Sequence, residues 1–165
     1  MGSSDMMDVD VFALFPGNWL TDKTIITFLK VAAIYSSKLN GKKAFVAFSF
    51  LYNNMCRDLD LAKKWYRNVN ICDYSLWVVP VNINQSHWIL VVLHPVKKEL
   101  WLYDSVANTH PNCVVLLKNG WLQIRESHGK IFMHYHNTLI CHCRLTAVTV
   151  EFCLYVGSWM RVNRH

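Results

Sequence analysis

The sequence predicts an α+β fold in which helices cover a mainly antiparallel sheet. Residues 87–104 contain two runs of β-branched, aliphatic and aromatic residues around Pro95 and a lysine pair, the composition of an antiparallel hairpin. The first run is apolar on both faces, as expected of a central strand with helices on either side. Segments with helical spacing of apolar residues precede and follow it. At 165 residues and 53% hydrophobic, the chain suits a single domain, expected over residues 1–165.

The N-terminal half is expected to be helical. Thr21 is a suitable N-cap for a first helix that should end between residues 36 and 41. Residues 44–53 are apolar enough for a short buried helix, and residues 59–67 carry apolar side chains on one side of another. Asn53-Asn54 is interpreted as the break between these two helices.

The remaining elements are strands and one helix. Residues 76–83 are expected to form a strand, although Pro80 favours an edge position or a strand end. The hairpin follows, and a helix should then run from residue 108 to 117 and stop at Lys118-Asn119-Gly120. Residues 131–135 could form a further strand.

Two polar residues, His87 and Asp104, lie at the outer ends of the two strands of the predicted hairpin. If its centre lies between Pro95 and Val96, His87 and Asp104 are each the same number of residues from the centre and face each other. Directly opposed Cβ atoms lie about 4.5 to 5.5 Å apart, within reach of an imidazole–carboxylate hydrogen bond. Such a bond fixes the tautomer of a catalytic base, so the pair predicts two members of a catalytic triad.

Composition and charge exclude several other classes. The acidic N-terminus lacks the features of a secretory signal, and no apolar run reaches the roughly 18 residues of a membrane span. We therefore expect an intracellular protein, nuclear or cytoplasmic, with no membrane partner and with reduced cysteines. The net charge of +6 comes with separate lysine pairs rather than one run, which argues against nucleic-acid binding. The chain has neither a Gly-rich phosphate loop nor a Gly-x-Ser-x-Gly elbow.

Four short motifs resemble a known family, the ubiquitin-like-protein (SUMO-type) proteases. They are Trp19-Leu20-Thr21-Asp22, Val79-Pro80-Val81-Asn82, His87-Trp88-x-Leu90 and Tyr103-Asp104-Ser105. They occur in the family's order and with similar spacing, and the resemblance covers about residues 18–112. It implies a papain-like cysteine-peptidase architecture with a central, mostly antiparallel sheet flanked by helices.

The resemblance also implies roles for individual residues. His87 resembles the general base of a Cys-His-Asp triad, and Asp104 its orienting acid. Trp19 and Trp88 resemble the walls of a narrow tunnel for a Gly-Gly tail, and Asp22 a contact to a basic residue of the modifier. The implied partner is a SUMO-type ubiquitin-like modifier or its conjugates, and no cofactor is implied.

The nucleophile is the missing part of the resemblance. The family carries a Cys-Gly pair after the aspartate, but this chain has none. Cys143 is our candidate nucleophile because Arg144 follows it and could lower the pKa of its thiol, and Cys141 is the alternative. A second hypothesis is that the segment from about residue 138 is translated in a shifted frame. When residues 143–156 are back-translated and the codons are read two nucleotides further on, the permitted codons include a Cys-Gly pair.

A metal site in the same segment is a third interpretation. The candidate ligands are His134, His136, Cys141, His142, Cys143 and Cys153. They lack the paired spacing of zinc motifs, so no metal is expected.

Two functions remain open. The first is a cysteine peptidase or isopeptidase that cleaves after a Gly-Gly tail by thiolate attack, with impaired activity. The second is a catalytically inactive module that binds a ubiquitin-like modifier, because binding and covalent chemistry use different residues.

Overall fold

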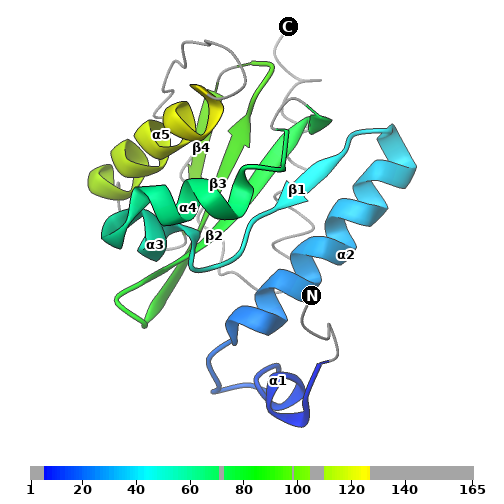
Figure 1. The fold of residues 1–165 in the computed structure, drawn as a ribbon. Helices are drawn as coiled ribbons and strands as arrows, with labels where there is room; N and C mark the ends of the chain where they lie inside the picture. The colour runs from blue at the N-terminus through cyan, green and yellow to red at the C-terminus, as the bar shows by residue number, and fades with distance from the viewer. Residues whose placement is uncertain (1–5, 71–72, 98, 105–109, 127–165) are drawn as a thin grey trace, which may run out of the picture.

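A four-stranded sheet lies between two helical layers in the computed structural model, which describes residues 6–70, 73–97, 99–104 and 110–126 (Figure 1). The strands are β1 (Ala44–Val46), β2 (Leu76–Ile83), β3 (His87–His94) and β4 (Glu99–Tyr103), in that order across the sheet. β1 pairs with β2 in parallel, whereas the β2–β3 and β3–β4 pairs are antiparallel. The expected α+β class with a mostly antiparallel sheet is therefore confirmed.

One face of the sheet is covered by α2 (Asp22–Asn40). As predicted, the helix begins after Thr21, whose hydroxyl accepts a hydrogen bond from the Thr24 amide at 3.1 Å. It ends at Gly41, whose φ of 69° is the left-handed conformation that glycine adopts at little cost. α2 buries a small apolar cluster against β2, β3 and β4, formed by Ile25, Leu29, Ala32, Val78, Leu90, Val92 and Tyr103.

The other face is covered by α3 (Leu51–Arg57), α4 (Leu59–Tyr66) and α5 (Pro111–Glu126). These helices form the larger core with the opposite side chains of the sheet, among them Ile89, Val91 and Leu93 of β3. Because β3 alternates between the two cores, both of its faces are apolar, as the sequence predicted.

The helix expected over residues 44–53 was wrong. Residues 44–46 form β1, paired with residues 76–78 of β2, and α3 begins only at Leu51. Asn53-Asn54 lies inside α3, and the break between the two helices falls at Asp58 instead. The Asp58 carboxylate accepts hydrogen bonds from the amides of Asp60 and Leu61 and so caps α4. A short apolar run has no decisive period, and here pairing with a neighbouring strand determined its conformation.

Pro80 lies inside a paired strand rather than at its end. It pairs with Leu90 of β3, but β1 extends along β2 only as far as Val78. The part of β2 that contains Pro80 thus has a described strand partner on one side only, so the absent amide proton of Pro80 interrupts no ladder on the β1 side.

The predicted stop of the last helix at Gly120 was also wrong, because α5 continues to Glu126. Gly120 is buried, and a Cβ atom there would lie 2.7 Å from the Met55 sulfur and 2.9 Å from its methyl carbon. The glycine therefore marks a close approach of α5 to α3 rather than a helix end.

A short helix, α1 (Asp8–Phe12), fixes the entry to α2. Asp10 is buried there, accepts a hydrogen bond from the Thr21 hydroxyl at 2.8 Å and lies 3.8 Å from the Lys23 ammonium. The Met7 amide, the Thr21 hydroxyl and Lys23 together lower the pKa of Asp10 below its usual value. Among the described helices, none is long and apolar enough to span a bilayer.

Candidate functional site

The hairpin brings His87 and Asp104 together by a different register from the predicted one. The observed pairs run from His94 with Glu99 to Leu90 with Tyr103, so the centre lies one residue later than expected. β3 ends at His94 because Pro95 cannot donate to the ladder and begins the turn. Continued along the strands, this register places Asp104 opposite Ile89, and direct opposition of His87 and Asp104 was therefore wrong.

The shift of two residues nevertheless keeps the two side chains on one face of the sheet. Side chains alternate with a period of two, so only an odd shift would have separated them. His87 and Asp104 are diagonal neighbours, a spacing that long side chains can bridge. His87 Nε2 lies 2.5 Å from Asp104 Oδ1.

This contact decides which imidazole nitrogen is available for chemistry. The Asp104 side chain has no exposed surface, and the carboxylate is the acceptor for the Nε2 proton of His87. Neutral imidazole carries one proton, so Nδ1 of His87 retains its lone pair. The His87 ring is 24% exposed and can be reached by a further group.

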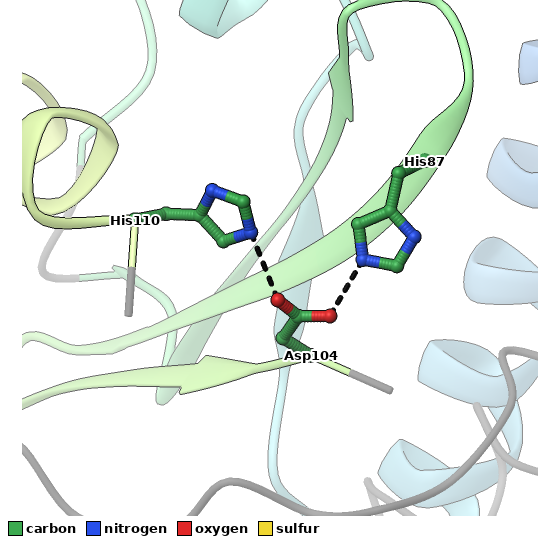
Figure 2. A group of neighbouring side chains, drawn as sticks. All are labelled: His87, Asp104 and His110. Carbon is green, nitrogen blue, oxygen red and sulfur yellow. Dashed lines mark hydrogen bonds and ion pairs between the residues drawn. The ribbon is translucent and has the colours of Figure 1, made fainter. Parts of the chain in front are cut away.

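A second histidine, which the sequence analysis did not assign to the site, occupies the other carboxylate oxygen. His110 Nε2 lies 2.8 Å from Asp104 Oδ2, and Figure 2 shows the two imidazoles approaching different oxygens of Asp104. His110 immediately precedes α5, and its carbonyl accepts a hydrogen bond from the Val114 amide at 3.2 Å. One signal could have revealed it: a buried carboxylate needs a partner for each oxygen, and His110 follows Asp104 by six residues.

The three side chains also form a set of possible metal ligands. One ligand atom from each of His87, Asp104 and His110 lies within 4.8 Å of the other two. Asp104 is buried and the two rings are partly exposed.

The residues predicted to bind substrate lie at the entry to α2 and on β3. Trp19 is 72% exposed, and the Trp88 indole is half-buried and donates a hydrogen bond to the Leu20 carbonyl at 3.2 Å. This bond ties the segment that carries Trp19 to the strand that begins with His87. Asp22 is the first residue of α2 and accepts a hydrogen bond from the Ser49 hydroxyl at 3.4 Å.

The predicted nucleophiles, Cys143 and Cys141, lie outside the described residues, as do the other ligands of the metal site considered for that segment and the strand expected over residues 131–135. Two other cysteines can be evaluated. Cys56 is exposed on α3, whereas Cys113 is buried in α5. Burial raises the pKa of the Cys113 thiol to about 12, with a smaller contribution from Cys56. Cys113 is therefore a neutral, poorly nucleophilic thiol.

Comparison with known proteins finds relatives in the family that the sequence motifs resemble. Residues 18–123 match the family described as the Ulp1 protease family, C-terminal catalytic domain. Sentrin-specific protease 2 of Mus musculus is 33% identical over 112 residues, which are 66% of this chain and 19% of that protein. Ubiquitin-like-specific protease 1 of Saccharomyces cerevisiae is 33% identical over 103 residues, 60% of this chain and 16% of that protein. The chain thus spans less than a fifth of the length of these relatives.

Solved structures share the fold. A de-sumoylating protease superposes with a TM-score of 0.77 at 15% identity, covering 97% of this chain and 73% of that one. The C-terminal Ulp1 protease domain in complex with Smt3, the yeast ortholog of SUMO, has a TM-score of 0.70 at 24% identity, covering 92% of this chain and 71% of that one. The family match over residues 18–123 shows that the chain belongs to the Ulp1 protease family.

Proposed function

We propose that this chain is a cysteine peptidase or isopeptidase domain of the SUMO-deconjugating type, acting on a SUMO-type modifier after its Gly-Gly tail. The observation that carries the proposal is the 2.5 Å contact between His87 Nε2 and Asp104 Oδ1 within the fold of this protease family. In this proposal His87 is the general base and Asp104 orients it. We further propose that residues 1–165 act as one domain in the nucleus or cytoplasm.

The geometry supports a defined proton path. With its Nε2 proton directed at Asp104, His87 would accept the thiol proton at Nδ1, and the buried carboxylate would stabilise the imidazolium. The thiolate would attack the glycine carbonyl, and the imidazolium would return its proton to the leaving amine. Water would then release the acyl group and regenerate the thiol.

Cys143 is the proposed nucleophile, and Cys141 is the alternative. Cys113 is a poor candidate because burial raises the pKa of its thiol to about 12. The sequence contains no Cys-Gly pair, and that observation favours a second candidate function, an inactive module that binds the modifier reversibly.

Substrate selection would rest on the aromatic residues beside the dyad. Trp88 is anchored through its indole nitrogen to the Leu20 carbonyl, whereas Trp19 is largely exposed and free to contact a ligand. A narrow space between two indoles admits residues without side chains, so it would select diglycine. Asp22 would bind a basic residue of the modifier.

A SUMO probe with a C-terminal electrophile tests the proposal. Covalent labelling that is lost in Cys143→Ala and His87→Ala, but kept in Cys56→Ala as the exposed-cysteine control, would support the peptidase. Labelling lost instead in Cys141→Ala would move the nucleophile to that residue. Tight association without covalent labelling would support the binding module. Absence of any association would refute both functions.

A further inference from the structure

Three ligand atoms of the kind that zinc prefers converge where α5 meets the hairpin. One ligand atom from each of His87, Asp104 and His110 lies within 4.8 Å of the other two, and both rings contact the carboxylate through Nε2. Figure 2 shows both rings directing Nε2 at the carboxylate, and the ring planes are only 29° apart. Two histidines and one carboxylate, with a fourth position left to water, form a common zinc ligand set.

We propose that His87, Asp104 and His110 bind a zinc ion. Zinc bonds to nitrogen and oxygen are about 2.0 to 2.2 Å long, which places tetrahedral ligand atoms roughly 3.3 Å apart. His87 Nε2 lies 2.5 Å from Oδ1 and His110 Nε2 lies 2.8 Å from Oδ2, so these two separations would have to widen by roughly 0.5 to 0.8 Å. Ion binding would require the two histidine side chains to rotate from their present rotamers.

Burial and charge favour a cation at this position. The Asp104 side chain has no exposed surface, so its negative charge requires nearby compensation. The His87 and His110 side chains are 24% and 18% exposed, which leaves an approach for the ion.

The backbone of His110 is also in an uncommon conformation. Its φ of 37° is uncommon for a residue other than glycine, and such conformations persist where the surrounding structure holds them. Here the strained residue directs its ring at Asp104.

Zinc at this site would change the proton position on His87. A neutral imidazole that binds a metal through Nε2 carries its single proton on Nδ1. Each histidine would therefore move one proton from Nε2 to Nδ1, with no net release. Nδ1 of His87 could then no longer accept a proton, so zinc would block the base. This consequence rests on the proposed function, whereas zinc binding itself does not.

Competition of the full 165-residue chain with a fluorescent zinc chelator tests the site. We expect one equivalent to bind and affinity to fall at least tenfold in His110→Asn. Asparagine tolerates the positive φ of that position, and thermal melting checks the fold. The double variant Cys141→Ser/Cys143→Ser is the matched control, because it removes thiols that could bind zinc elsewhere, and it should bind as the parent does.

The outcomes separate this inference from the proposed function. Binding that survives in His110→Asn and disappears in the double cysteine variant would overturn the site, as would no binding at micromolar zinc. If His110→Asn fails to fold, nitrogen NMR of the parent decides: zinc must shift the Nε2 resonances of His87 and His110 and leave His94 unchanged. Zinc titration and labelling by the electrophilic SUMO probe are separate measurements on the parent chain, so failure of one leaves the result of the other standing.

Discussion

Substituting Gly120 tests how closely α5 approaches α3, and α5 is the helix that follows His110. In Gly120→Ala, the new Cβ would lie 2.7 Å from the Met55 sulfur, 2.9 Å from its methyl carbon and 3.3 Å from a Leu59 methyl. Alanine improves helix propensity by about 1 kcal/mol, whereas overpacking a core costs about 1 to 3 kcal/mol. Met55 is only 4% exposed and has little room to move. We expect a net destabilisation of about 1 kcal/mol.

A double-mutant cycle removes the clash and should reverse the sign. Met55→Ala alone should cost about 2 to 5 kcal/mol because it deletes a buried side chain. In that background Gly120→Ala should stabilise the protein by about 1 kcal/mol, giving a coupling energy of about 2 kcal/mol. The assay is urea unfolding followed by far-UV circular dichroism. Asn119→Ala, at the exposed neighbouring position, is the control and should not depend on Met55. Stabilisation by Gly120→Ala in the parent would refute the close approach.

Four further predictions concern single groups. Thr21→Ala removes the cap of α2 and a hydrogen bond to a buried carboxylate, so urea unfolding should show a loss of about 1 to 2 kcal/mol; an unchanged midpoint would contradict the capping geometry. Iodoacetamide at pH 8 should alkylate exposed Cys56 much faster than Cys113, and mass spectrometry should find the difference gone in denaturant. Because the folded pKa of Cys113 is raised, its contribution to stability is complete below its ordinary pKa of 9.0 and is lost as the pH rises towards about 12; loss beginning well below 9 would contradict this. Asp104→Asn removes the carboxylate acceptor of the Nε2 proton, so nitrogen NMR should show His87 leaving the single tautomer it has in the parent; an unchanged spectrum would argue against the contact.

Sequence reasoning predicted the elements with a strong local signature. Thr21 and Gly41 enclose a helix with a regular apolar stripe, and α2 was predicted correctly. β3 was recognised from two apolar faces, which now lie in two separate cores. Local signals were weaker at Ala44–Val46, which were expected to be helical but form a strand paired with β2. They were also weaker at Gly120, which was expected to end the helix but lies where α5 approaches Met55 closely.

In the candidate site too, some residues were predicted from the sequence and one was not. The motifs identified His87 and Asp104, and the two-residue alternation of side chains along the strands placed them on one face of the sheet. The observed register differs from the predicted one by two residues, which preserves that face. His110 was not assigned: its closeness in sequence to Asp104 was a signal, but only the fold shows that the histidine before α5 reaches the second carboxylate oxygen.

The sequence by itself determined the class of fold, the family motifs and the choice of His87 and Asp104, because these depend on residue type and on periods of two and 3.6 residues. Only the tertiary structure decided the hairpin register, the continuation of α5 through Gly120 and the second histidine on Asp104. Each of these depends on how different elements meet in the folded chain, and that geometry is set by packing of the whole core rather than by local preference.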